Sequence, residues 1–401
     1  MKRQIFTGIT AAALCLTGCG TSEKESGYIR NKETAYYDMS YNVYDNGLIY
    51  QVNYDQAYFL DYETMSSIPL CNKPNCTHSS ASCISNLCLS SSPMTFVYQD
   101  YVYWFTSDSQ IVDSEDGKTQ RVEVLTKCMR AALSTGEVET FVEIPDVFMN
   151  SQIDMVIVGN VLYIIGGEEY HQEENGIWAG YGRSGPQYLY TINLETAQAE
   201  NHGRVNDSPY AEYNWSFGGS VHSEVEIDGV YEGKIYMHYW YVDDPQLIMD
   251  AVNNKSFFDA QKEIPWQYEN KCYDPKTGEM TVSDLPYAWW ICDDTYVYLE
   301  GDTFYVMDQD GNAVPAPNIQ KNGSYDITFV NGKLWKCTSG GGFDPKTGEV
   351  ISLAEPYTAD GTWILDYVND EYVVQYYDAD YNIQFDFVNE EELRGETSCT
   401  S

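Results

Sequence analysis

Basic residues are scarce in this 401-residue chain: 22 Lys and Arg stand against 61 Asp and Glu, a formal net charge of −39. Nucleic acids and anionic membrane surfaces both require a basic face on the protein, so this balance argues against binding to either. The chain also lacks an apolar run of the roughly 20 residues that a membrane-spanning helix requires. His-Glu-x-x-His, Gly-x-Ser-x-Gly and phosphate-loop motifs are absent, and no pair of acidic residues stands out as catalytic.

The first residues have the layout of a secretory signal peptide. Lys2 and Arg3 give a positive start, Ile5 to Leu16 form a short apolar stretch, and small residues then lead to Cys19. An uncleaved anchor helix is the alternative, but the apolar stretch is shorter than a bilayer span. We therefore predict export from the cytoplasm.

The stretch Leu16-Thr17-Gly18-Cys19 resembles the lipobox of bacterial lipoproteins. The resemblance implies cleavage before Cys19 and diacylation of its sulfur, and two acyl chains suffice for stable anchoring. We therefore expect a protein on the outer side of the cell membrane that contacts the membrane only through this lipid. The chain then divides into a signal peptide (1–18), a lipidated and flexible tether (19–34) and one folded domain (35–401).

The folded part is rich in residues that favour β-sheets. Tyr occurs 36 times, against 14 Phe and 9 Trp, while good helix formers are sparse. Short apolar runs, most of them containing Tyr, alternate as strands do: Leu48–Val52, Val102–Phe105, Val161–Ile165, Lys234–Met237, Tyr296–Leu299, Leu334–Trp335 and Tyr372–Val374. These runs predict an all-β fold.

A recurrent turn follows these runs. Tyr273 to Glu279 and Phe343 to Glu349 share the letters Asp-Pro-Lys-Thr-Gly-Glu, and weaker copies lie near residues 64, 135 and 196. Asp bonds to its own backbone, Pro fixes φ and Gly accepts a positive φ, so this is turn chemistry. Asp308–Gly311 and Asp378–Asp380 fit by position. Both could begin a calcium loop, but each lacks the Glu at position twelve, which favours hairpin turns.

A unit of strands joined by hairpins and repeated about seven times predicts a β-propeller with seven blades. Rings of six or eight blades and a pair of β-sandwiches are the alternatives. Wide spacing between turns indicates loop insertions at 106–121, 166–187, 202–224 and 242–266. The last insertion holds the best helix candidate, around Gln246–Val252. We expect Ala35–Met39 to complete the last blade, because ring closure removes exposed sheet edges.

Cys71, Cys76, His78 and Cys83 are crowded together, and Cys88 follows closely. Three thiolates and one imidazole make a complete tetrahedral zinc set, and the gaps of 4, 1 and 4 residues can fold around one ion. Such a closed site would be structural. Disulfides are the alternative, because exported proteins meet oxidising surroundings, and four cysteines allow three pairings. The spacing leaves both interpretations open.

The stretch from Leu70 to His78, Leu-Cys-Asn-Lys-Pro-Asn-Cys-Thr-His, followed by Cys83, resembles a motif of uncharacterised β-propeller-like lipoproteins of anaerobic Gram-positive gut bacteria. Those proteins similarly combine a lipobox with Tyr-rich hairpins and Asp-x-x-Thr-Gly-Glu turns, and the final Asn382 to Leu393 is similar to their ending. The resemblance implies a surface-anchored propeller in an anaerobic host, which weakens the case for disulfides. The family has no established activity.

Aromatic residues gather in and beside the insertions. The candidates for a ligand-binding surface are Trp178, Tyr181, Arg183, Tyr213, Trp215, Trp240 and Trp266. Flat rings on loops can stack on sugars or anchor a protein partner, although each ring could instead pack beneath its own loop. We predict a non-catalytic binding module for a glycan, peptide or protein. A carbohydrate-active hydrolase or lyase and a structural protein of the cell envelope are the alternatives.

Overall fold

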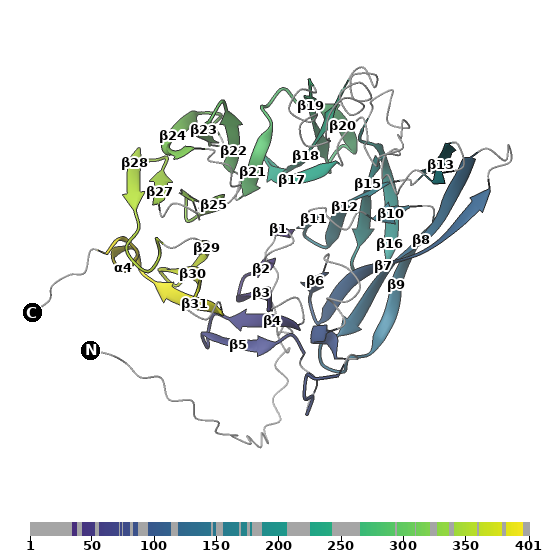
Figure 1. Cartoon of the computed structure of the whole chain (residues 1–401), viewed down its shortest axis with the longest axis horizontal. Coiled ribbons are helices and arrows are strands. Elements are labelled where there is room, and N and C mark those ends of the chain that lie inside the picture. The colour runs from purple at the N-terminus through teal and green to yellow at the C-terminus, as the bar shows by residue number, and fades with distance from the viewer. Residues whose placement is uncertain are drawn as a thin grey trace, which may run out of the picture.

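The chain is a seven-bladed β-propeller, with its blades arranged in a ring (Figure 1). The predicted fold class and blade number are confirmed. The computed structural model describes residues 34–37, 42–52, 56–71, 73, 75–80, 83–86, 95–113, 119–145, 147–149, 155–167, 170–174, 177–178, 187–206, 225–242, 265–292, 295–308, 310–320, 327–336, 341–358, 361–378 and 382–395. None of the helices in these ranges is long and apolar enough to cross a membrane.

The first three blades are antiparallel sheets that follow one another along the chain. The first contains β2 (Asn42–Tyr44), β3 (Gly47–Val52), β4 (Gln56–Asp61) and β5 (Ser66–Pro69). The second contains β6 (Thr95–Tyr98), β7 (Tyr101–Asp113), β8 (Thr119–Ala132) and β9 (Val138–Pro145). The third contains β11 (Met155–Val158), β12 (Val161–Gly167), β15 (Gln187–Asn193) and β16 (Gln198–Arg204), and β10 (Phe148–Met149) pairs with β12.

The last four blades continue the same pattern. The fourth contains β17 (Glu226–Tyr231), β18 (Lys234–Tyr241), β19 (Gln267–Asp274) and β20 (Glu279–Val282). The fifth contains β21 (Ala288–Cys292), β22 (Thr295–Glu300), β23 (Thr303–Met307) and β24 (Ala313–Gln320). The sixth contains β25 (Ile327–Val330), β26 (Lys333–Lys336), β27 (Gly341–Asp344) and β28 (Glu349–Ser352). The seventh contains β29 (Trp363–Val368), β30 (Glu371–Tyr377) and β31 (Ile383–Val388), and the short helix α4 (Glu390–Arg394) follows.

The apolar runs found in the sequence are the second strands of the seven blades. They correspond to β3, β7, β12, β18, β22, β26 and β30. The blades of the ring stack face to face, so both faces of a second strand pack against neighbouring blades. In β12, for example, Leu162, Ile164 and Ile165 are completely buried. The core of the molecule therefore consists of apolar layers between successive blades.

The recurrent turns join the third and fourth strands in six of the blades. In the fourth blade, Asp274 accepts a hydrogen bond from the N–H of Lys276 at 2.8 Å, and Gly278 adopts a φ of 74°. Asp308 likewise accepts from the backbone of Asn312 at 2.9 Å, so this segment is a hairpin turn, as predicted. The turn at Asp378 differs from the others: it joins the second and third strands of the seventh blade, one hairpin earlier than the repeat.

The ring has two distinct faces because the strands of each blade alternate in direction. Hairpins between second and third strands, and connections between blades, emerge on one face. All four predicted insertions begin at such positions, so we call this the insertion face. The recurrent turns of the first six blades lie on the opposite side, the turn face.

Insertions from two neighbouring blades form one common sheet. The 106–121 insertion extends β7 and β8 into a long hairpin, with Asp113 opposite Gln120. From the 166–187 insertion, β13 (Tyr170–Glu174) pairs with β8, and β14 (Ile177–Trp178) pairs with β13. This projecting sheet extends beyond the ring (Figure 1). Most of 202–224 and 242–266, including the helix candidate Gln246–Val252, lies outside the described residues.

The N-terminal strand does not complete the last blade, so that expectation was wrong. Instead β1 (Thr34–Tyr37) runs antiparallel to β11, with Thr34 opposite Val158 and Tyr37 opposite Met155. Tyr37 is also opposite Asn42 of β2. The innermost strands of the first and third blades offer backbone groups toward the centre of the ring, and β1 pairs with these (Figure 1). This direction places Thr34 at the turn face.

The ring closes by side-chain packing between the seventh and first blades. The ring of Tyr50 meets that of Phe385 edge-on, with centroids 4.7 Å apart. The Tyr62 hydroxyl donates to Asp366 Oδ2 at 2.9 Å, and Val373 is buried in the same cluster. Contacts between residues about 300 positions apart in sequence therefore join the two ends of the propeller.

Candidate metal centre

The cysteine–histidine cluster lies in the connection from β5 to β6, between the first and second blades. At its start, the N–H of Leu70 donates to the carbonyl of Ala57 in β4 at 2.9 Å. Further on, Ile84 is fully buried in the same apolar cluster as Leu133, which begins the β8–β9 turn. The connection is thus attached to both blades that it joins.

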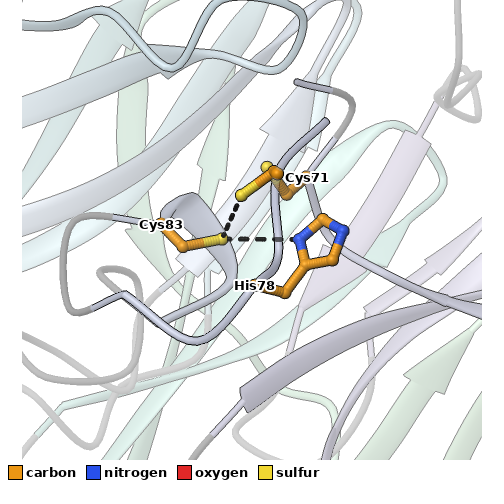
Figure 2. A group of neighbouring side chains, drawn as sticks. Cys71, His78 and Cys83 are labelled. Atoms are coloured by element: carbon orange, nitrogen blue, oxygen red, sulfur yellow. Dashed lines mark hydrogen bonds between the residues drawn. The ribbon is translucent and has the colours of Figure 1, made fainter. Parts of the chain in front are cut away.

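Local backbone geometry turns the four ligand side chains inward. Asn75 and His78 have positive φ values of 60° and 55°, a conformation to which Asn and His are better suited than most residues. The N–H of Cys76 donates to Lys73 at 3.2 Å, which closes a tight turn. Cys71, His78 and Cys83 consequently point toward one another (Figure 2).

The spacing of the ligand atoms matches tetrahedral coordination. Sγ of Cys76 lies 3.7 Å from Sγ of Cys83, which lies 3.6 Å from Nδ1 of His78. Bonds of about 2.3 Å to sulfur and about 2.0–2.1 Å to nitrogen give tetrahedron edges of about 3.8 and 3.5 Å. With Cys71, all four atoms lie within 4.8 Å of one another, so this set can hold a metal ion.

The sulfurs are not joined in disulfides in this structure. Cys71, Cys76 and Cys83 are free thiols, and the 3.7 Å between Cys76 and Cys83 far exceeds the roughly 2.05 Å of a disulfide bond. Cys88 lies outside the described residues. The structure therefore brings the four predicted metal ligands close together, whereas the disulfide alternative stays a prediction.

Backbone N–H groups of the loop donate to two of the thiols. The N–H of His78 lowers the pKa of Cys76, which is half-buried. Burial raises the pKa of Cys71 to about 11, opposed by a hydrogen bond from the N–H of Lys73. In both cases the donor N–H belongs to the residue two positions after the cysteine, so the same type of hydrogen-bonded turn occurs at Cys71 and at Cys76.

Three supporting residues were missed by the sequence analysis. The Gln56 side chain, on β4, donates to the carbonyl of His78 at 2.9 Å. The Asn86 side chain donates to the carbonyl of Ser80 at 2.8 Å, and the Ser85 hydroxyl lies 3.1 Å from Sγ of Cys83. Ser85 and Asn86 could have been suspected from their place directly after Cys83. Nothing in the sequence pointed to Gln56.

The predicted ligand-binding residues are only partly described. Tyr181, Arg183, Tyr213 and Trp215 lie outside the described residues. Trp178 lies in β14, opposite Glu173, at the edge of the projecting sheet.

Trp240 belongs to an aromatic patch at the insertion-face ends of the fourth and fifth blades. Its ring contacts those of Tyr268 and Tyr287, with both pairs of centroids 5.4 Å apart. Tyr268 is 45% exposed, while Trp240 is half-buried. Trp266, also half-buried, directly precedes β19, which carries Tyr268. The aromatic rings of this patch therefore pack against one another and are also partly exposed to solvent.

A buried histidine supports this patch and was not singled out from the sequence. Nδ1 of His238 lies 2.7 Å from Asp228, and Nε2 lies 3.7 Å from Glu226. A β-bulge at Asp228 directs this carboxylate toward the histidine. The ring of Tyr287 meets that of His238 edge-on at 4.4 Å. Burial and Asp228 raise the pKa of Glu226, while His238 lowers it.

No protein-family model matches the chain, and no curated protein matches it. Among solved structures, it is similar to an oligogalacturonate lyase in complex with manganese, at 10% identity and a TM-score of 0.34, over 79% of this chain and 72% of that one. An acylaminoacyl peptidase of Pyrococcus horikoshii matches at 12% identity and 0.38, over 90% of this chain and half of the peptidase. The computationally designed protein Ika8 matches at 9% and 0.32, over 90% and 98%. These low scores carry no conclusion about function.

Proposed function

We propose that this protein is a lipid-anchored, extracytoplasmic β-propeller that binds a glycan, peptide or protein ligand with its insertion face. The observation that carries the proposal is the direction of β1. Its pairing with β11 places Thr34 at the turn face, opposite the face from which all four insertions emerge. A tether from Cys19 would therefore approach the turn face, and the insertions would be presented away from the membrane.

The insertion face supports a binding role through its shape and its aromatic residues. The projecting sheet of β7, β8, β13 and β14 combines segments of two blades, and the patch around Trp240 lies on the next blades of the ring. Loops on a rigid ring are common positions for ligand recognition, and half-exposed aromatic rings are typical anchors. The turn face offers short turns in the first six blades instead.

In this proposal the cysteine–histidine cluster is structural. Four protein ligands would fill a tetrahedral site and leave no open position for a substrate, whether the ion is zinc or another metal. Disulfides would serve the same purpose of fastening the connection between the first two blades. Neither version contributes to the ligand site.

The anchor and its orientation are tested together. Cells expressing the wild type should incorporate a palmitate label, and Cys19→Ser should abolish it. The purified lipidated protein is then placed on vesicles that carry a lipid-bound quencher, with a dye at residue 116 of the β7–β8 tip or at residue 277 of the turn face. Stronger quenching at residue 277 is expected. Absence of label, or stronger quenching at residue 116, would contradict the proposal.

Ligand binding is tested with a shortened hairpin. Replacing residues 109–124 by Asn-Gly removes the tip while keeping Asp108 opposite Leu125. We expect at least tenfold weaker binding to whichever polysaccharide or envelope peptide of a panel the wild type binds, whereas the turn-face variant Asp274→Ala should bind normally. If the shortened variant binds the ligand as tightly as the wild type does, the proposed binding role of the insertion face is wrong. Turnover of a polysaccharide by the wild type would replace it with an enzymatic function.

A further inference from the structure

We propose that Cys71, Cys76, His78 and Cys83 bind one Zn²⁺ ion as a closed structural site, in which Ser85 and Gln56 position the ligands. The inference is independent of ligand binding at the insertion face, because it depends only on the connection between the first two blades. Within the described residues, this is the group of His, Cys, Asp and Glu side chains whose ligand atoms converge closely enough to hold an ion.

The donor set selects the class of metal. Three thiolates and one imidazole are soft and intermediate ligands, which suit zinc and disfavour calcium, magnesium and manganese. The separations of 3.7 Å between sulfurs and 3.6 Å between sulfur and nitrogen match the edges of a zinc tetrahedron. All four ligand atoms lie within 4.8 Å of one another, at most about 1 Å above the ideal edge.

The surroundings are suited to hold charge on the sulfurs. Three thiolates and Zn²⁺ carry a net charge of −1, and the Lys73 ammonium, whose charge acts on Cys76, offsets it. Backbone N–H groups donate to Cys71 and Cys76, and the Ser85 hydroxyl, completely buried, lies within reach of Cys83. Each sulfur therefore has a donor beside it that would stabilise the metal-bound thiolate.

Gln56 connects the site to the first blade. Its amide donates to the carbonyl of His78 at 2.9 Å and lies 3.3 Å from Ser85 Oγ, so one side chain of β4 holds both sides of the loop. Ile84, next to Cys83, is buried with the second blade. A zinc ion here would fix the connection at the point where the chain passes from one blade to the next.

The test measures metal content directly. The domain from residue 20 to 401 is purified without chelator from cells grown with zinc, iron and manganese, and its metals are quantified by mass spectrometry. One zinc per chain is expected in the wild type and in Cys272→Ser, a buried cysteine outside the cluster. Cys83→Ser should retain less than a tenth of the zinc, while His78→Cys, which keeps four soft ligands, should retain most of it.

A second measurement keeps the proposal testable if Cys83→Ser fails to fold. Replacing the metal of the wild type by Co²⁺ should give the visible absorption of a tetrahedral thiolate site, and thiol labelling after metal removal should modify the cluster cysteines. Gln56→Ala should bind zinc at least several-fold more weakly. Zinc retained by Cys83→Ser, a different metal, or a mass lower by the hydrogens of disulfides without any metal would each overturn the proposal.

Discussion

The first blade meets its two neighbours in different ways. Toward the seventh blade it relies on side chains that are far apart in sequence, such as Tyr50 against Phe385 and Tyr62 with Asp366. Toward the second blade it has a shared apolar cluster and, in addition, the connection that carries the cysteine–histidine cluster. The ring is therefore closed by packing at one junction and fastened by a compact loop at the other.

The difference shows how a propeller can close without exchanging strands between its ends. Within the described residues, the seventh blade has three strands, and the N-terminal strand pairs at the inside of the ring instead. Closure then depends on apolar and aromatic contacts between the seventh and first blades. The short helix α4 packs between the seventh and sixth blades instead. The loop between the first two blades has few apolar residues of its own, so we expect it to need a metal ion or covalent bonds.

The largest effect should come from removing the metal. Treatment with a strong chelator, or the substitution Cys71→Ser, is expected to destabilise the domain by about 4 kcal/mol, because loss of a metal is among the few mechanisms with effects this large. This corresponds to a fall in Tm of about 5 °C for a domain of this size, because the unfolding entropy is about 2.1 cal/mol/K per residue. Differential scanning calorimetry measures it. An unchanged Tm in both samples would mean that the cluster does not fasten this junction.

At the opposite junction, Tyr50→Ala should cost about 3 kcal/mol, because a buried aromatic ring is lost and a cavity remains. Tyr377→Ala is the matched control, since that ring is 46% exposed, and it should change stability by less than about 0.5 kcal/mol. Urea denaturation measures both. The chelator effect should be the same in Tyr50→Ala as in the wild type, because the junctions are separate.

A smaller effect is expected for Tyr62→Phe. The variant removes the hydroxyl that donates to Asp366 while it keeps the ring, which is 3% exposed. The cost should be about 1.5 kcal/mol, as for a hydrogen bond to a charged acceptor. A double-mutant cycle with Asp366→Asn isolates the pair. A coupling energy near zero would show that this bond does not contribute to ring closure.

The smallest effect concerns pH and the far side of the seventh blade. Partial burial raises the pKa of Glu390, but hydrogen bonds from Lys333 and Arg394 outweigh it and hold the pKa below the ordinary 4.5. A lowered carboxyl pKa stabilises the fold above pH 4.5, and this contribution is lost as pH falls through the folded-state pKa.

Glu390→Gln should therefore cost under about 1 kcal/mol at pH 7, since the group is partly exposed. The difference from the wild type should shrink below pH 4.5. Denaturant titrations at pH 7 and at successively lower pH values measure it. A difference that stays constant across this range would show that ionisation of Glu390 is not the cause.

Local sequence patterns predicted the parts of the fold that depend on neighbours along the chain. The short apolar runs, most of them containing Tyr, identified the second strand of every blade, because these strands are buried on both faces. The Asp-Pro-Lys-Thr-Gly-Glu turns were identified because each side-chain hydrogen bond is made within the turn itself. The cysteine–histidine cluster was found from its spacing for the same reason.

Features that depend on partners distant in sequence were missed. The pairing of Tyr170 with Arg121, the placement of Thr34 opposite Val158, and the contact of Asp228 with His238 all join separate segments. The exposed edge of a strand pairs through backbone groups that nearly all residues share. The side-chain pattern therefore does not indicate which segment pairs there. Gln56 illustrates the same limit at the cluster, because its partner His78 is 22 residues away.

The most direct test of the account is hydrogen–deuterium exchange of the purified domain with and without chelator. If a metal ion fastens the first two blades, chelation should accelerate exchange in residues 70–86 and in the neighbouring β8–β9 turn, while β29 to β31 at the closing junction keep their protection. Unchanged exchange around the cluster, or equal acceleration at both junctions, would contradict it.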